Sequence, residues 1–163
     1  MLSRELALVS SIFSPAPSGM KRDPKITSRI MAAIKSRDTE PERMLGRAMW
    51  ALGLRYRKSY NLPGKPDFAL TWAKIAVFCD GDFWHGNNWS LRGYGSLEEE
   101  LSRYTDFWAQ KIMRNIERDK RVDDQLSTDG WTVVRFWESD IRRDADACAQ
   151  IVRWMWEAKR KSV

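Results

Sequence analysis

The spacing of apolar and polar positions predicts two helices in the first third of the chain. The first has apolar residues three or four positions apart, at Ile26, Ile30, Met31 and Ile34. The second is predicted over about 40–51. There, Thr39 and Glu42 form a capping-box pattern, and Gly53 follows the last periodic position. Both segments are therefore expected to pack one apolar face against the rest of the protein.

Short apolar runs in the middle of the chain predict strands. Residues 54–60 alternate in polarity, and the turn-rich segment 61–66 leads into 67–70, so these segments are predicted to form a hairpin. The run 75–79 is apolar on both faces, as expected of a buried central strand. The polar residues 80–82 follow it directly, so this strand is predicted to end at a group of acidic side chains.

The second half of the chain repeats the alternation of helix and strand. A long helix is predicted over about 97–128, a buried strand over 131–137 and a last helix over about 144–159. The apolar stripe of the last helix is predicted at Ile151, Trp154 and Met155. This order of elements predicts an α/β fold with a small mixed sheet flanked by helices.

Turn-forming residues and composition define the domain organisation. Because 14–19 is rich in Ser, Pro and Gly, residues 1–19 are predicted to form a flexible N-terminal tail and residues 20–163 a single domain. No apolar run is long enough for a membrane span, and 43% hydrophobic residues exclude a disordered chain. Cys79 and Cys148 have no CxxC spacing, so a reducing cytoplasmic location is expected.

The charge balance favours a polyanionic partner. The chain has 28 lysines and arginines against 22 acidic residues, a formal net charge of +6. A field of this sign attracts nucleic acid, although the same balance also serves solubility. Double-stranded DNA is therefore a candidate partner, to be decided by the residues that could carry chemistry.

Acidic residues and a histidine gather near the ends of two predicted strands. Asp67 lies in the first strand, and the second could add the main-chain carbonyl of Cys79 and the carboxylate of Asp80. Carboxylates, carbonyls and water are the ligands that Mg²⁺ prefers. His85, the only histidine of the chain, follows closely and could take a proton from an attacking water. These residues predict a magnesium-dependent hydrolytic site.

Five ordered motifs strengthen this interpretation. Residues 79–86 read CDGDFWHG, 31–42 fit MxxIxxRDTxxE, and 62–67 read LPGKPD. Further along, 107–119 fit FWxxKIxxNxxRD, and 130–138 begin with GW and end with FWE. Together these motifs resemble the very-short-patch-repair (Vsr) family of DNA mismatch endonucleases. Accidental agreement of five blocks in order and spacing is improbable.

The resemblance implies a fold, a reaction and roles for particular residues. The fold would be a PD-(D/E)xK, restriction-endonuclease-like core. Asp67 and the carbonyl of Cys79 would bind magnesium, His85 would activate a water, and Glu42 and Asp119 would orient waters of the magnesium shell or the base. The family nicks one strand beside a T·G mismatch, which leaves 5′-phosphate and 3′-hydroxyl ends.

The resemblance also implies a DNA-binding surface. The aromatic side chains that would wedge into the base stack are Phe83, Trp84 and Trp108, with Met31 and Ile34 as a second wedge. Aromatic residues also form protein cores, which is the alternative for these positions. Lys111 and Arg118 lie on a predicted helix that would flank the duplex, where they fit phosphate contacts.

One feature of the family is missing. Its well-known members hold a structural zinc with three cysteines and one histidine, whereas the matching positions here are Asp82, Asn87, Trp89 and Ser139. None of these is a convincing thiolate or imidazole ligand, so no structural zinc is expected.

Three functions therefore stand at the level of sequence. The leading hypothesis is a Vsr-like nicking enzyme that acts in mismatch repair next to a cytosine methyltransferase, as a monomer or weak dimer. The second is a restriction or phage-defence endonuclease with another specificity. The third is a catalytically inactive DNA-binding module.

Overall fold

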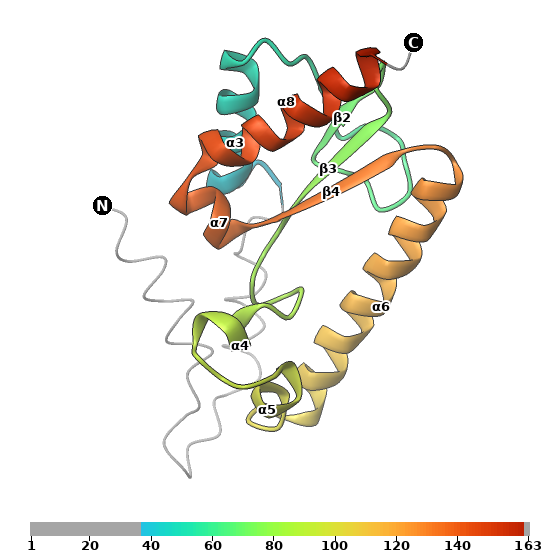
Figure 1. Cartoon of the computed structure of the whole chain (residues 1–163). Helices are drawn as coiled ribbons and strands as arrows, with labels where there is room; N and C mark the ends of the chain where they lie inside the picture. The colour runs from blue at the N-terminus through green and yellow to red at the C-terminus, as the bar shows by residue number, and fades with distance from the viewer. Residues whose placement is uncertain (1–36, 162–163) are drawn as a thin grey trace. The chain divides into compact units, whose positions relative to one another are not determined.

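The computed structural model describes residues 37–161, and within this range a mixed sheet has helices on both faces (Figure 1). The strands are β1 (Arg57–Lys58), β2 (Phe68–Leu70), β3 (Ile75–Asp80) and β4 (Thr132–Trp137). The sheet order is β1-β2-β3-β4, with the first two pairs antiparallel and the last parallel. The predicted α/β class with a small mixed sheet is confirmed.

The helices of the described range are α3 (Glu40–Ala51), α4 (Asn88–Leu91), α5 (Leu97–Leu101), α6 (Asp106–Thr128), α7 (Glu138–Arg143) and α8 (Ala145–Lys161). None of them combines the length and apolar character that a membrane crossing requires. The predicted tail over 1–19 and the predicted first helix, with Met31 and Ile34, lie outside the described residues.

Helix α3 begins as its sequence predicts. The side-chain hydroxyl of Thr39 accepts a hydrogen bond from the main-chain N–H of Glu42, and the Glu42 carboxylate accepts from the main-chain N–H of Asp38 at 2.8 Å. These contacts satisfy main-chain donors that a helix start leaves without partners. Gly53 follows the helix with φ +81°, a conformation that favours glycine.

The two faces of β3 form separate cores. Ile75 and Val77 face a cluster built with α3, α7 and α8, which includes Leu45, Met49, Ile141, Ala149 and Val152. Ala76 and Phe78 face the other way and pack with Leu126 of α6. This alternation is why β3 is apolar at successive positions, and it makes β3 the buried centre of the domain.

Strand register brings three chain segments to one edge of the sheet. Phe68 pairs with Val77 in the antiparallel direction, so Asp67 lies beside the end of β3. In the parallel pair, Asp80 lies opposite Trp137. The start of β2 and the ends of β3 and β4 therefore meet, which is where the predicted chemical residues lie.

Two predicted elements differ from the structure. The strand predicted over 54–60 contracts to β1, because Ser59 adopts φ +50° and ends the extended conformation. The helix predicted over 97–128 is divided into α5 and α6, because Thr105 is extended and starts a new helix. A polar residue with a helix-capping role therefore interrupts an otherwise periodic stretch.

The predicted stripe of α8 is wrong for Ile151 and Trp154, whereas Met155 is partly buried and packs against the core. Ile151 is exposed, and Trp154 is 74% exposed, whereas Cys148, Ala149 and Val152 are the buried positions. These smaller side chains also recur at helical spacing, and they let α8 lie close to α3. Helix α7 was not predicted; its six residues follow β4 without an intervening loop.

The turn before β2 offers a test of packing against α6. A Cβ on Gly64 would lie 2.5 Å from a methyl of Val122, whereas Gly93 has open space and almost the same φ, +72° against +71°. We expect Gly64→Ala to lower the free energy of unfolding by about 2–4 kcal/mol and the matched control Gly93→Ala by about 1 kcal/mol. Urea denaturation measures both, and equal losses would contradict the contact.

Candidate active site

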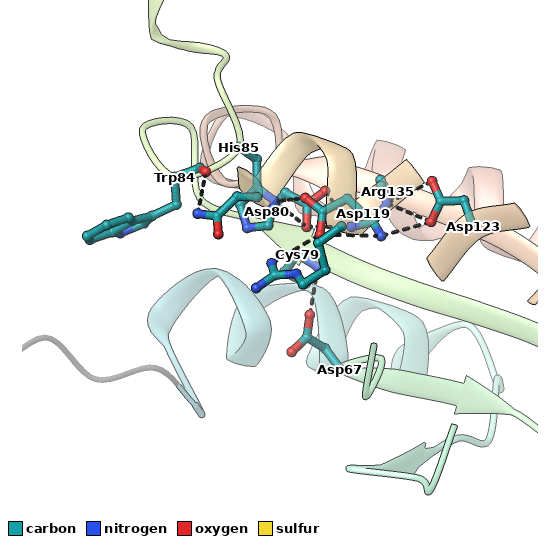
Figure 2. Close-up of polar contacts among 10 residues, drawn as sticks. Asp67, Cys79, Asp80, Trp84, His85, Asp119, Asp123 and Arg135 are labelled. Atoms are coloured by element: carbon teal, nitrogen blue, oxygen red, sulfur yellow. Dashed lines mark hydrogen bonds and ion pairs between the residues drawn. The ribbon is translucent and has the colours of Figure 1, made fainter. Parts of the chain in front are cut away.

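Asp67 is a buried carboxylate held at the end of β3. Its Oδ2 accepts a hydrogen bond of 2.7 Å from the main-chain N–H of Cys79 (Figure 2). Burial, assisted by the nearby charges of Glu42 and Asp80, raises the pKa of Asp67 to about 6, although the Cys79 hydrogen bond opposes this shift. A carboxylate surrounded in this way is one that a bound cation would stabilise.

Cys79 contributes its main chain to the site. Burial raises the pKa of its thiol, and the charges of Asp67, Glu42 and Asp80 act in the same direction. The thiol therefore stays protonated and is a poor nucleophile or metal ligand. This agrees with the expectation that the ligand at this position is the main-chain carbonyl.

Asp80 lies apart from Asp67. Figure 2 shows Asp80 in a row of side chains with His85, Asp119, Arg135 and Asp123, and Asp67 separate from that row. Both oxygens of Asp80 accept hydrogen bonds of 3.0 Å from Nη1 of Arg135. Asp80 is therefore engaged in an ion pair, and its predicted role as a magnesium ligand stays a prediction.

His85 forms a short hydrogen bond with Asp119 of α6. Its Nδ1 lies 2.5 Å from Oδ2 of Asp119 and 3.7 Å from Oδ1 of Asp80. Burial acts to raise the pKa of Asp119, but hydrogen bonds from His85 and Arg118 hold it below its usual value. Because an ionised carboxylate only accepts, the proton must lie on Nδ1, which leaves the lone pair on Nε2.

Arg135 is a central residue of the site that was not predicted from the sequence. Its guanidinium binds Asp80 on one side and Asp123 on the other, with contacts to Asp123 of 2.8–3.1 Å, and it lies 4.0 Å from Asp119. Two signals could have indicated it. Arg135 is the only charged residue in the strand TVVRFW, and Asp119 and Asp123 are four residues apart on one helix face.

These side chains line one pocket. Its walls are Asp80, His85, Ile116, Asp119, Lys120, Asp123, Asp124, Arg135 and Trp137. The pocket joins the ends of β3 and β4 to the middle of α6, so a substrate atom entering it would meet the imidazole of His85. Three of the carboxylates on its walls are balanced by a single guanidinium.

Glu42 forms hydrogen bonds that stabilise the first turn of α3. One oxygen accepts from the Thr39 hydroxyl at 2.8 Å and the other from the Asp38 main chain at 2.8 Å. The helix-capping function, which is the alternative to a role in the chemistry, is therefore present, and Glu42 is also close enough to influence the pKa of Asp67. A role in orienting water stays a prediction.

The donor set can be tested for its fit to magnesium. Across residues 37–161, no three His, Cys, Asp or Glu side chains are grouped as a metal site would require. Mg²⁺ is commonly held by only one or two carboxylates and keeps several waters. Asp67 and the adjacent main chain of Cys79 fit that more open arrangement, and the raised pKa of Asp67 indicates unbalanced negative charge.

An aromatic cluster follows His85 and continues onto α6. Phe83 is only 6% exposed, and its ring contacts those of Trp84, Tyr104 and Trp108. Phe83 is therefore the interior of the cluster, and Trp84 and Trp108 are half-buried. Phe107, which had no predicted role, is 60% exposed beside Trp108 and offers the largest open aromatic surface of the cluster.

Lys111 of α6 lies against this cluster. The ammonium of Lys111 lies 4.9 Å from the ring centre of Trp84 and 5.3 Å from that of Trp108. Arg118 pairs with Oδ1 of Asp119 at 3.1 Å. Asn115 donates to the carbonyl of Trp84 at 2.9 Å, so α6 holds the main chain of the segment that carries the aromatic residues.

The positions compared with zinc ligands are largely joined by direct hydrogen bonds. The carboxylate of Asp82 accepts from the side chain of Asn87 and from both the main chain and hydroxyl of Ser139. Trp89 is half-buried in α4. The expectation of no structural zinc stays a prediction.

Comparison with known proteins agrees with the motifs. Residues 21–91 match the model of the family described as DNA mismatch endonuclease Vsr. The chain is 46% identical to the Type II nicking enzyme V.NmeDIP of Neisseria meningitidis serogroup C, over 80% of this chain and 85% of that protein. It is 42% identical to the Type II nicking enzyme V.HpaIIP of Haemophilus parainfluenzae, over 71% and 79%. With DNA mismatch endonuclease Vsr of Escherichia coli (strain K12) the identity is 36%, over 74% of each.

The environment of Asp67 predicts a stability change without metal. Since the folded protein raises this pKa to about 6, ionised Asp67 destabilises the fold above that pH. We expect Asp67→Asn to raise the free energy of unfolding by about 1–3 kcal/mol near pH 8 with EDTA present.

The gain should vanish near about pH 4, where Asp67 of the folded protein is protonated. Thermal unfolding across pH measures the difference, and Asp129→Asn at the exposed C-terminal end of α6, outside the pocket, is the matched control. A destabilised Asp67→Asn variant near pH 8 would show that the buried charge is already balanced.

Proposed function

The chain belongs to the Vsr family of DNA mismatch endonucleases and is a DNA endonuclease; we propose that it nicks one strand of a duplex by magnesium-assisted hydrolysis beside a T·G mismatch. The observation that carries the proposal is the His85–Asp119 pair, which lies next to the strand end that holds Asp67. A hydrolytic base and a candidate cation ligand thus come from neighbouring segments.

His85 is the proposed general base. The Asp119 carboxylate keeps the proton on Nδ1, so Nε2 accepts a proton from water as the water oxygen attacks phosphorus. The new P–O bond forms while the bond to the 3′ oxygen breaks, and that oxygen takes up a proton. The products are a 5′-phosphate and a 3′-hydroxyl.

Asp119 and Asp80 support the charged form of the base. When Nε2 takes a proton the imidazole becomes a cation, and both carboxylates lie within 4 Å of Nδ1. The positive charge that develops on the imidazole is thus close to two carboxylates, and opposite charges at this distance attract. Asp119 therefore both orients the base and stabilises the state that it reaches.

Asp67 and the carbonyl of Cys79 would hold the magnesium ion, with Asp80 as a further candidate. When bound, the ion supplies neutralisation of the negative charge that develops on the phosphate oxygens. Asp67 is suited to this role because it is buried and lies near the carboxylates of Glu42 and Asp80, so a cation would stabilise its negative charge.

The fold and the DNA-binding surface are proposed by analogy with the family. A PD-(D/E)xK core agrees with an acidic residue beside the end of a central strand, as Asp67 is beside β3. The aromatic cluster offers Trp84, Trp108 and the exposed Phe107 to an opened base stack. Lys111, which lies beside these rings, would contact DNA phosphates or bases next to the opened stack.

Nicking is favoured over double-strand cleavage because the relatives include proteins named Type II nicking enzymes. We propose that the protein acts as a monomer, since one chain supplies every residue of the pocket. A functional link to a cytosine methyltransferase is proposed from the mismatch, because deamination of 5-methylcytosine produces thymine opposite guanine.

The proposal predicts cleavage of one labelled strand. With each strand of T·G and T·A duplexes labelled separately, we expect a magnesium-dependent nick in one strand of the T·G duplex and none with EDTA. Asp67→Ala and His85→Ala should each lower the rate at least about 10³-fold.

Other results would identify the alternative functions. Equal cutting of both strands of a matched duplex would indicate a restriction or phage-defence endonuclease. Binding of DNA without any cleavage would indicate a DNA-binding module.

The role of Asp119 can be tested separately. Asp119→Asn keeps the side-chain shape but no longer fixes the proton on Nδ1, so we expect the single-turnover nicking rate to fall about 10–100-fold. The dissociation constant for DNA, measured with calcium in place of magnesium, should stay within about twofold. Glu117→Gln, an exposed change on the same helix, is the matched control. A normal rate for Asp119→Asn would remove Asp119 from the mechanism.

A further inference from the structure

Asp82 is a buried carboxylate outside the pocket. It is 4% exposed, and its two oxygens receive three hydrogen bonds. Ser139 donates twice, from its main-chain N–H at 3.0 Å and from its hydroxyl at 2.8 Å, and the side-chain amide of Asn87 donates at 2.6 Å. A single side chain thus connects the segment after β3 with the first residues of α7.

The main chain strengthens the same connection. The main chain of Asp82 also interacts with the carboxylate of Glu138, the residue before Ser139. The carbonyl of Asp82 accepts from the N–H of Asn87 at 2.8 Å, which closes the segment 82–87. Asp82 is therefore bonded through both its main chain and its side chain.

The segment 82–87 carries Trp84 and His85, and it has two anchors. On one side, α6 holds it through Asp119 to His85 and through Asn115 to the carbonyl of Trp84. The second anchor lies beyond the sheet. The pairing of β3 with β4 ends at Asp80 and Trp137, and two residues further along each chain Asp82 is hydrogen-bonded to Ser139. Without the second anchor, the segment would be tied to the end of β3 only by the chain through Gly81 and by the hydrogen bond of 3.1 Å from the His85 N–H to the Gly81 carbonyl.

We propose that Asp82 is a positioning residue, which holds the segment with His85 and Trp84 in register with the strand end of Asp67. This inference rests on the proposed function for its catalytic consequence. Its structural part is independent, because it concerns where His85 lies and not what His85 does.

A carboxylate is required at this position. The Ser139 N–H and the Asn87 amide are donors, and the Ser139 hydroxyl donates as well, so every contact with the Asp82 side chain needs an acceptor. In Asp82→Asn one oxygen becomes an NH₂ group, so the Asn87 amide and the Ser139 hydroxyl must both turn from donor to acceptor, and all three hydrogen bonds lose their charged acceptor. Because the site is buried, water cannot replace the weakened contacts.

The test is an exchange of the two partners. Asp82→Asn should remove the negative charge and force the Asn87 amide and the Ser139 hydroxyl to reverse, and Asn87→Asp should place two carboxylates in contact. The double variant Asp82→Asn/Asn87→Asp restores one donor and one acceptor, with the Ser139 hydroxyl free to rotate. We expect each single variant to lower the single-turnover rate at least tenfold and the double variant to recover to within about threefold of wild type.

A second readout does not depend on activity. His85 is the only histidine of the chain, so its imidazole ¹H–¹⁵N resonances report the position of the segment without overlap. We expect the hydrogen-bonded Nδ1 proton signal to broaden or shift in each single variant and to return in the double variant. Asn61→Asp, which adds a negative charge at an exposed turn, is the control and should leave both readouts unchanged.

The outcomes separate the two proposals. Recovery of the His85 signal in the double variant supports the positioning role even if the wild-type protein proves unable to nick DNA. Wild-type rate and signal in Asp82→Asn, or a double variant no better than either single one, would overturn it. If Asp82→Asn does not fold, Ser139→Ala removes one donor alone, and an unchanged rate and signal there would also overturn the proposal.

Discussion

The pairing of β3 with its two neighbours is the constraint on which the site depends. The antiparallel contact with β2 places Asp67 beside Cys79, and the parallel contact with β4 places Arg135 where it reaches Asp80. A shift of one residue in either register would turn these side chains to the opposite face of the sheet. The separate cores on the two faces of β3 resist such a shift, because they too would be inverted.

Charge within the site is arranged around Arg135. Its guanidinium contacts Asp80 and Asp123 directly and lies near Asp119, which in turn holds His85. A buried carboxylate without such a partner would be strongly destabilising. Asp67 has no direct ion pair of this kind among the described contacts, and burial raises its pKa to about 6. The protein thus balances the carboxylates around its base and leaves one carboxylate for a cation.

Local signals in the sequence were sufficient for part of this structure. Thr39 and Glu42 predicted the start of α3, and the apolar run ending at Cys79 predicted β3, because capping and burial act over a few residues. The contact of His85 with Asp119 joins residues 34 positions apart and depends on how α6 crosses the sheet, so only the family resemblance suggested it. The ion pair of Asp80 with Arg135 joins residues 55 positions apart; a single charge in the strand TVVRFW indicates that Arg135 needs a partner but does not identify Asp80.

The shielding of Arg135 has a consequence for how the protein responds to ionic strength. Its contacts with Asp80 and Asp123 are partly buried and short, so dissolved ions screen them weakly. The approach of a basic protein to a polyanion, in contrast, weakens steeply as salt displaces the condensed counterions. Added salt should therefore slow association with the duplex but leave the hydrolysis step largely unaltered. A single salt titration would thus separate DNA binding from hydrolysis.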